Sequence, residues 1–528
     1  MSCLPINPPK VLIRQVMGWL NNGCAFVNID GLKLNLLTVL LLIGISPALA
    51  VSLDQNAFSD AFVTKRAQIK LQYETLDLPK NESMGILGAS YLVEVSPEVF
   101  LGPAAYGAIY GNRGGFYSFG GELAWHHLVY PSLELQTGLY VGGGGGAGGN
   151  AYWGGGLMLR PHADLLWRVG DFKAGVSASN VTFPDGGQAD SSQLGLVLVM
   201  DTQLSYTNPD YVGHQLETGG RQGLGFDRVV PTAGIYFVEQ GSKKIGGAPQ
   251  DNQLEFVGAR LEHFVTPEIY VGLEAIGSVS NGADGYAEFL GTVGYEQPLV
   301  TDLTLGARLG LGTAGGGNVD VGGGFLAKVE AYATYDLTMD THLSLEAGYT
   351  TAPDGHFDAF STAMNLVFDL DHPFNAKLSQ RIVEQEFSMG TAHYFSASTK
   401  AGPSYAADLV TIKMNHYLND NLYLTGQTHW TYGGNFPGYG VGLFGLGYRS
   451  DRMANGIRAG LEMLAGGGGG ASVDTRGAIL QPMAFVEVPL LNQVSIKAGF
   501  GELISVKGNL ATPVVDLAVN FDYGANGR

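Results

Sequence analysis

The chain has 528 residues, a formal net charge of −19 and two cysteines. The acidic balance argues against nucleic acid as a partner, because phosphate binding requires clustered Lys and Arg. Both cysteines, Cys3 and Cys24, lie within the first 50 residues, so the remainder has neither a disulfide framework nor thiolate chemistry.

The N-terminus carries the pattern of a secretion signal. Lys33 precedes an apolar run at 34–45, and Ala48-Leu49-Ala50 then forms a small-residue cleavage site. The run is shorter than the roughly 20 residues that a spanning helix needs, which favours a cleaved signal over a retained anchor. We therefore predict that residues 1–50 are an N-terminal extension with a cleavable signal peptide.

Beyond the signal, alternation of apolar and polar residues predicts β-strands. In residues 303–311, leucines and Ala307 form one face, and Arg308 with Thr and Gly forms the other. An apolar face opposite small and charged residues fits a strand between lipid and a polar lumen. A soluble sandwich or barrel shows the same alternation, so the pattern alone leaves open which face of the strand contacts water.

The first third of the mature chain contains about eight such segments. They lie at 70–75, 86–95, 99–109, 116–128, 133–141, 156–168, 172–181 and 194–206. The connections alternate in length, with tight turns at 96–98, 129–131 and 169–171 and longer, Gly-rich connections between them. Short turns at one end and long loops at the other are typical of outer-membrane barrels.

A motif of glycine run, Ala-Gly strand and apolar closing strand then occurs three times. The glycine runs are 142–146, 315–317 and 466–470; the Ala-Gly strands are 172–176, 343–349 and 494–500; the closing strands are 194–200, 364–370 and 517–523. The regular spacing predicts three internal repeats of about eight strands each. We place β-repeat 1 at 51–215, β-repeat 2 at 216–378 and β-repeat 3, with the closing strand, at 379–528.

Two barrel architectures follow from this repetition. One is a single barrel of about 24 strands, within the known range; the other is three tandem eight-stranded barrels whose interiors are filled by side chains. The joins at 207–230 and 371–383 are long for periplasmic turns, which supports separable units. Three complete barrels in one chain are uncommon, so the single wide barrel is favoured. The glycine runs are interpreted as flexible extracellular loops, because no phosphate-loop signature follows them.

Charged residues at inward positions are the best functional candidates. Lys173, Glu346 and Lys497 each stand immediately before an Ala-Gly pair. The full set of predicted lumen-lining residues is Glu122, Glu134, Arg160, Lys173, Arg308, Lys328, Glu346, Arg458, Glu462 and Lys497. In a wide barrel they would line water and bias ion passage, whereas in narrow barrels they would pair in a packed polar core. The mixed signs argue against a catalytic role, and the sequence indicates no catalytic, cofactor-binding or metal-binding residue.

The chain ends in a strand with Leu517, Val519, Phe521 and Tyr523 on one face. This strand resembles the aromatic-ended last strand of bacterial outer-membrane proteins. With the signal, the alternation and the loop asymmetry, residues 51–528 resemble Gram-negative outer-membrane β-barrel proteins. The resemblance implies an all-β, transmembrane antiparallel barrel in the cell outer membrane, in contact with its lipid. It also implies recognition by the outer-membrane assembly machinery through the C-terminal strand, and no cofactor.

Three functions are compatible with this class. The favoured function is a porin-like pore or channel that passes small polar or ionic solutes. The second is a non-conducting structural or adhesive protein that acts through its extracellular loops. The third and weakest is a lipid- or glycan-modifying barrel enzyme. We expect no enzyme, because the chain lacks a Gly-x-Ser-x-Gly elbow and repeats no Ser, His and acid arrangement.

Overall fold

A computed structural model describes residues 28–29, 32–33, 61–170, 172–217, 221–280, 282–370, 374 and 379–527. The chain divides into two units, Met1–Pro47 and Ala48–Arg528. In the first unit, the described residues form the short antiparallel pair β1 (Asn28–Ile29) and β2 (Leu32–Lys33). The predicted cleavage site at 48–50 lies outside the described residues.

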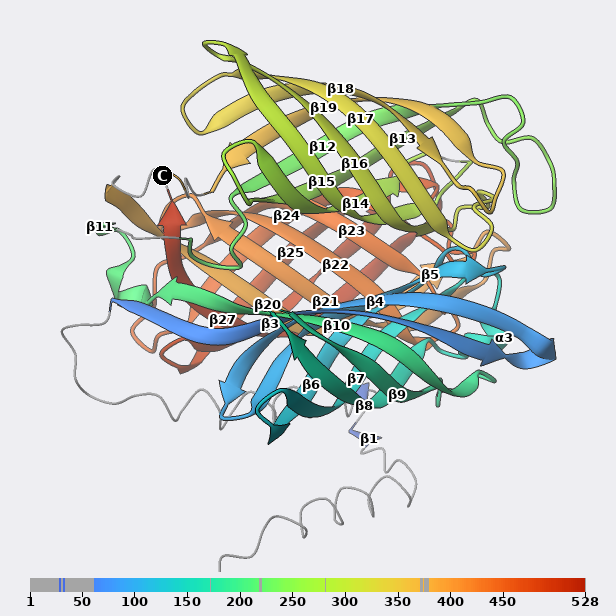
Figure 1. Ribbon diagram of the computed structural model, residues 1–528, viewed down its shortest axis with the longest axis horizontal. Coiled ribbons are helices and arrows are strands. Elements are labelled where there is room, and N and C mark those ends of the chain that lie inside the picture. Colours follow the sequence, from blue (N-terminus) through green and yellow to red (C-terminus); the bar gives the residue numbers. More distant parts are fainter. Residues whose placement is uncertain are drawn as a thin grey trace, which may run out of the picture. The chain divides into compact units, whose positions relative to one another are not determined.

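The second unit begins with eight antiparallel strands that close on themselves (Figure 1). They are β3 (Phe62–Leu78), β4 (Glu82–Ser96), β5 (Val99–Gly111), β6 (Phe116–Tyr130), β7 (Leu133–Gly146), β8 (Leu157–Val169), β9 (Phe172–Thr182) and β10 (Asp190–Thr207), with the short helices η2 (Pro79–Asn81) and α3 (Asn150–Trp153) in the connections. Strand β10 closes the first barrel by pairing with β3 from Gly195↔Glu74 to Thr207↔Phe62. The predicted tight turns are confirmed as the short connections between Ser96 and Val99, between Tyr130 and Leu133, and between Val169 and Phe172.

The next eight strands form a second closed barrel. They are β12 (Arg228–Val238), β13 (Gln253–Phe264), β14 (Ile269–Ser278), β15 (Ala287–Val300), β16 (Leu303–Gly315), β17 (Phe325–Asp336), β18 (Thr341–Thr351) and β19 (Asp358–Asp369). Closure is made by β12 and β19, whose pairing runs from Arg228↔Asp369 to Val238↔Ala359.

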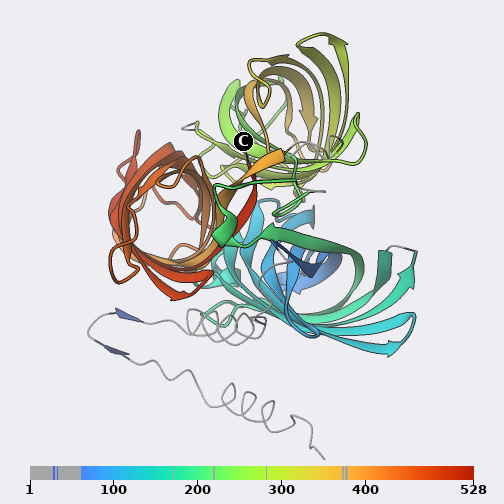
Figure 2. The ribbon, with the colours of Figure 1, turned by 90° about the vertical axis from the view of Figure 1, so that its left-hand side faces the viewer.

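The last eight strands close in the same way, and Figure 2 shows this barrel nearly end-on. They are β20 (Ser379–Ser398), β21 (Ser404–Tyr417), β22 (Leu422–Gly434), β23 (Gly440–Arg449), β24 (Arg458–Gly469), β25 (Gly477–Leu491), β26 (Val494–Ser505) and β27 (Ala511–Gly527). Strand β27 closes the third barrel by pairing with β20 from Arg381↔Gly527 to Tyr394↔Val514.

The connection after β10 joins the hydrogen-bonded networks of the first and third barrels. Thr207 of β10 pairs with Gly524 of β27, and after η3 (Pro209–Tyr211) the short strand β11 (Gln215–Glu217) pairs with the start of β20. Each barrel nevertheless completes its own circuit. The favoured single barrel of about 24 strands is therefore wrong, because the closing pairs β3–β10, β12–β19 and β20–β27 separate the strands into sets of eight. Eight tilted strands enclose a space that side chains alone can fill.

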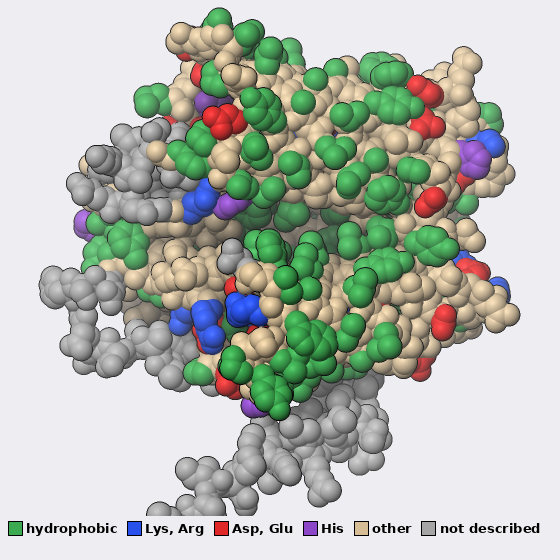
Figure 3. Space-filling model, viewed as in Figure 1, with side chains coloured by type: hydrophobic (Ala, Val, Ile, Leu, Met, Phe, Trp, Pro, Cys, Tyr) green, Lys and Arg blue, Asp and Glu red, His purple; other side chains and the backbone are tan. Residues whose placement is uncertain are grey.

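The outer faces of the barrels are apolar. Leu305, Leu309 and Leu311 are 43–48% exposed, whereas Arg308 between them on the same strand is 2% exposed. This outcome confirms the predicted assignment of apolar side chains to the outside and charge to the inside. Figure 3 shows one face on which hydrophobic side chains cover the middle and charged side chains lie mainly toward the two edges.

The lipid-facing role of this surface can be tested at Leu345, which lies within β18 and is 59% exposed. Replacing Leu345 by Arg is expected to destabilise the second barrel in a bilayer by about 2–4 kcal/mol, because a cation near the midplane loses its hydration. Leu337→Arg is the control: Leu337 is similarly exposed but lies in the turn after β17, where the cost falls to about 0–1 kcal/mol. Urea unfolding in lipid vesicles measures both, and equal costs would contradict the placement of this face in lipid.

The glycine runs are not flexible loops, which corrects the prediction from the sequence. Gly142–Gly146 completes β7, Gly315 ends β16 and Gly466–Gly469 completes β24. A Cβ at Gly115 would collide with the backbone of Gly315 and Gly316, one at Gly285 with Gly469 and Gly470, and one at Gly438 with Gly145 and Gly146. The runs therefore pack one barrel against the next, where only residues without a side chain leave enough room.

These glycine junctions follow one another in a ring. The connection before β6 of the first barrel meets the end of β16 in the second, the connection before β15 meets the end of β24 in the third, and the connection before β23 meets the end of β7 in the first. This head-to-tail order closes after three steps, as heterologous contacts do in a cyclic trimer. Aromatic rings from all three barrels complete the contact: Phe119 stacks on Trp430 at 4.5 Å between centroids and lies 4.9 Å from Phe289, and Tyr117 contacts the same two rings.

Candidate functional site

The interior of each barrel has two tiers, of which the one at the long-loop end is apolar. In the first barrel, Trp153 of α3 and Phe183 of the β9–β10 connection fold inward and pack with Phe116, at ring-centroid distances of 4.6 and 6.2 Å from Phe116. Trp153 is fully buried and donates a hydrogen bond from Nε1 to the carbonyl of Gly146. The loops therefore close this end of the barrel with aromatic side chains.

The second and third barrels are closed in the same manner. In the second, Phe357 and Val319 from the long connections pack with Tyr236 and Tyr286 inside the barrel. In the third, buried apolar side chains come from both strands and connections, and those from the connections are Phe436, Tyr439, Val473 and Leu510. All three apolar tiers are buried, so they exclude water from the long-loop end of each lumen.

Ion pairs fill the second tier of the first barrel. Lys70 Nζ lies 2.7 Å from Glu122 Oε1 and 2.8 Å from Asp164 Oδ2, and all three side chains are fully buried. Arg160 binds Glu74 through Nε at 2.7 Å and Nη2 at 3.0 Å. Further ion pairs lie toward the short-turn end, where Lys173 Nζ contacts Glu134 at 2.8 Å and Asp201 at 2.9 Å, and His126 contacts Glu134 at 2.7 Å.

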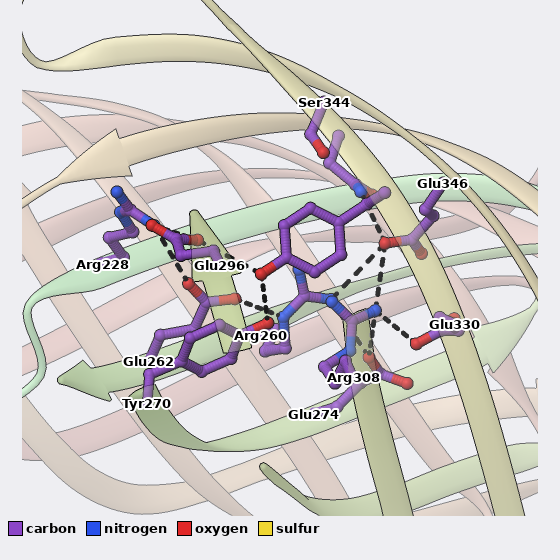
Figure 4. A network of polar contacts seen from close by, with 12 residues as sticks. Arg228, Arg260, Glu262, Tyr270, Glu274, Glu296, Arg308, Glu330, Ser344 and Glu346 are labelled. Atoms are coloured by element: carbon purple, nitrogen blue, oxygen red, sulfur yellow. Dashed lines mark hydrogen bonds and ion pairs between the residues drawn. The ribbon is translucent and has the colours of Figure 1, made fainter. Parts of the chain in front are cut away.

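The second barrel holds the most extensive network (Figure 4). Arg308 contacts Glu330, and its Nη2 lies 3.0 Å from Glu346 Oε2 and 3.5 Å from Glu274 Oε2. Lys328 Nζ bridges Glu274 and Glu288 at 2.8 Å each. Near the short-turn end, Arg228 contacts Glu296 at 2.8 Å and Asp369 at 2.7 Å. These side chains cross the lumen and hold one another in place.

The third barrel is filled by similar pairs with a different composition. Lys497 Nζ lies 2.5 Å from Glu462 Oε1, and Tyr423 donates its hydroxyl to the same carboxylate at 2.7 Å. Lys413 pairs with Asp516 at 2.5 Å. Toward the short-turn end, Arg449 contacts Glu384 at 2.7 Å, and Arg458 lies 3.7 Å from Glu384 and 3.8 Å from Glu487.

All ten residues predicted to face a lumen point into a barrel and take part in these networks. Eight of them are buried, and only the side chains of Glu134 and Arg458, at 12% and 13%, retain some exposure. The structure distributes them among three separate interiors: Glu122, Glu134, Arg160 and Lys173 in the first barrel, Arg308, Lys328 and Glu346 in the second, and Arg458, Glu462 and Lys497 in the third.

Sequence reasoning missed several of their partners. Lys70 and Glu74 belong to β3, where Gln68, Lys70, Gln72 and Glu74 alternate with outward residues and are all buried. That alternation was visible in the sequence as a polar face of period two. Glu274 and Arg449 are the only charged residues on the inward faces of β14 and β23, so the pattern does not distinguish them, whereas Glu386 shares its face of β20 with Glu384.

The described residues contain no group of three or more His, Cys, Asp and Glu arranged to hold a metal ion. Within the same part of the chain, none of the helices has the length and apolar character needed to cross a membrane.

Comparisons with known proteins give no close relative. No protein-family model and no curated protein sequence matches the chain. Similar solved structures include OpdQ of Pseudomonas aeruginosa, with 9% identity over 87% of this chain and 98% of that one and a TM-score of 0.21. OccAB3 of Acinetobacter baumannii has 8% identity over 87% and 99% and a TM-score of 0.22. The copper transporter OprC has 12% identity over 87% and 80% and a TM-score of 0.27.

Proposed function

We propose that this chain, an outer-membrane β-barrel protein located in the outer membrane of a Gram-negative cell, is a non-conducting scaffold made of three closed barrels. The observation that carries the proposal is the apolar tier at the long-loop end of each lumen, above a network of buried ion pairs. A solute would have to displace packed aromatic side chains and then break ion pairs, and both steps are costly.

The scaffold proposal also accounts for the junctions between barrels. The glycine contacts and the aromatic cluster lie toward the long-loop ends of the barrels. They therefore bring the long connections of the three barrels together. A joint rim of this kind suits a structural or adhesive role, in which the loops present a surface and the barrels anchor it. Contact with outer-membrane lipid and insertion by the assembly machinery through β27 belong to the same proposal.

Planar-bilayer recording tests the scaffold proposal. The purified mature chain is expected to leave the membrane conductance unchanged, while a general porin reconstituted in parallel produces stable steps. Insertion is verified in the same preparation by protection of the strands from protease in vesicles. Stable conductance steps from the wild-type chain, with ion selectivity altered by Lys328→Gln, would contradict the proposal.

A gated channel is the second candidate, and one observation favours it. Several polar atoms inside the third barrel have no hydrogen-bond partner in the described part of the chain, and they include Arg449 Nη1, Asp516 Oδ2 and both side-chain polar atoms of Asn520. Water would satisfy such groups, and a hydrated interior is what a polar solute needs to pass. This candidate predicts conductance steps that disappear when the third barrel alone is altered, as in Asp516→Leu.

A further inference from the structure

A cavity of about 730 Å³ lies at the short-turn end of the third barrel. Its wall includes the turn residues Asp420, Asp451 and Asn492, all exposed, so the cavity opens to solvent on that side. The connection between the first two barrels forms another part of the wall through Pro209, Asp210 and Val212. On the inner side the cavity reaches Glu384, Arg458 and Asp522, which belong to the polar interior.

Negative charge is in excess around this cavity. Five carboxyl groups and two guanidinium groups line it: those of Asp210, Glu384, Asp420, Asp451 and Asp522 against those of Arg452 and Arg458. Deeper in the barrel, the guanidinium groups of Arg449 and Arg458 share Glu384 and Glu487 at 2.7–3.8 Å. Lys497 Nζ forms an ion pair with Glu462 Oε1 at 2.5 Å. In the described part of the chain, none of these three inward cations forms an ion pair with Asp522, although the Nε and Nη1 atoms of Arg449 and Arg458 have no hydrogen-bond partner there.

Asp522 is the inward carboxylate that remains without a cation among the described residues. It is 4% exposed, it lines the cavity, and its Oδ1 has no hydrogen-bond partner in the described part of the chain. Its cross-strand neighbour in the β20–β27 pairing is Glu386, which is also buried and carries the same charge. A buried carboxylate opposite another carboxylate is costly unless a donor reaches it.

The second barrel shows what this position requires. Asp369 follows Phe368 in its closing strand as Asp522 follows Phe521, and its cross-strand neighbour is Arg228. Arg228 donates from Nε to Asp369 Oδ1 at 2.7 Å, and the Nε2 of His342 lies 3.2 Å from Asp369 Oδ2. The third barrel thus keeps the aspartate but has Glu386 where the second barrel has Arg228. Its negative charge is left unpaired, so a cation from outside can bind there.

The remaining wall indicates the kind of cation. Val212, Pro489, Leu490 and Leu491 contribute apolar surface beside the carboxylates. Carboxylate oxygens accept charge-assisted hydrogen bonds from ammonium and guanidinium groups, and aliphatic side chains pack against a methylene stem. We propose that this cavity binds a linear organic cation with an alkyl stem, whose terminal ammonium or guanidinium group reaches Asp522 and takes the place that Arg228 occupies in the second barrel.

Isothermal titration of the mature chain in detergent micelles at low salt, with agmatine as the probe, tests the proposal. Saturable binding is expected, and Asp522→Asn is expected to weaken it by at least about 10-fold, because one charge-assisted contact is lost. Asp369→Asn changes the equivalent aspartate of the second barrel and is expected to leave agmatine binding unchanged. Titration with 1,4-butanediol, which has the stem without the charge, is expected to give no saturable heat.

A second variant covers a failure of Asp522→Asn to fold, which is detected by its mobility in unheated gels. Glu386→Arg restores the pairing of the second barrel, so it is expected to raise thermal stability and abolish agmatine binding. The proposal is overturned if the wild-type chain gives no saturable heat, if Asp522→Asn or Glu386→Arg binds agmatine as tightly as the wild type, or if MgCl₂ displaces agmatine at equal concentration.

Discussion

Replacing Arg308 by methionine is expected to lower the free energy of unfolding of the second barrel by about 3–5 kcal/mol. Arg308 is buried and contacts Glu330, Glu346 and Glu274. Methionine has a similar length but no charge. Among the described residues, Glu330 would then have no cation in contact, while Glu346 and Glu274 would keep only Arg260 and Lys328 as cationic partners. The loss comes mainly from these uncompensated charges, because the ion pairs themselves gain little beyond the cost of their desolvation.

The measurement must report on the second barrel alone. That barrel contains no tryptophan, so intrinsic fluorescence would follow the other two. Urea-dependent hydrogen exchange, read by mass spectrometry on peptides from 228–369, isolates the change. Arg168→Met, in the first barrel, is the control and is read on peptides from 62–207: the pair of Arg168 with Asp201 at 3.3 Å is half-exposed, and a cost of about 0–1 kcal/mol is expected.

A double variant separates charge from packing at Arg308. Adding Glu330→Gln to Arg308→Met removes one of the stranded carboxylates, so it is expected to recover part of the lost stability. No recovery, or a cost no larger than that of Arg168→Met, would contradict the idea that the network is closed and dry.

The local structure was predictable because its causes are local. Period-two alternation places Leu309 outside and Arg308 inside, whatever the strand number of the barrel. The turn lengths are likewise set by nearby residues, and the two-residue connection at 301–302 has Asp302 at a φ of +67°. The inward orientation of all ten candidate charges follows from this alternation.

Closure into sets of eight was not predictable from the same pattern. Whether β10 pairs with β3 or with a strand of the next repeat depends on contacts far apart in the sequence, and both alternatives bury the same faces. The pairing of Lys70 with Glu122 has the same character, since 52 residues separate them. The internal triplication of the sequence remains a prediction, and the three sets of eight strands agree with it.

The glycine junctions were misread for a related reason. A glycine run in isolation indicates flexibility, and its other use, the close approach of two backbones, depends on a partner segment elsewhere in the chain. The glycine at each opposing connection, followed by an aromatic residue in Gly115-Phe116, Gly285-Tyr286 and Gly438-Tyr439, was the available signal.

Replacing Gly285 by valine is expected to separate the second barrel from the third. Gly285 has a φ of +91°, and a side chain there would collide with the backbone of Gly469 and Gly470. Positive φ costs a β-branched residue about 1–3 kcal/mol, and overpacking of the junction adds about 1–3 kcal/mol. Only the overpacking acts on the contact between the barrels. It lowers the equilibrium constant for forming that contact by up to about 100-fold.

An ion pair beside the junction provides the readout. Lys400 of the third barrel lies 2.9 Å from Asp284 of the second, so a zero-length carbodiimide reagent is expected to join them in the wild-type chain. The cross-linked peptide is expected to disappear in Gly285→Val. Gly247→Val is the control, because Gly247 has a φ of +90° and a Cβ at that position would meet no atom within 4 Å.

The control therefore carries the same backbone strain without the collision, and its cross-link is expected to persist. Loss of the cross-link in both variants would assign the effect to strain in the second barrel, and its persistence in both would show that the glycines are not what holds the barrels together. Loss in Gly285→Val alone means that the barrels touch because Gly285 has no side chain, so that two backbones can approach closely. A run of glycines can then join barrels as specifically as large residues join the two faces of a core.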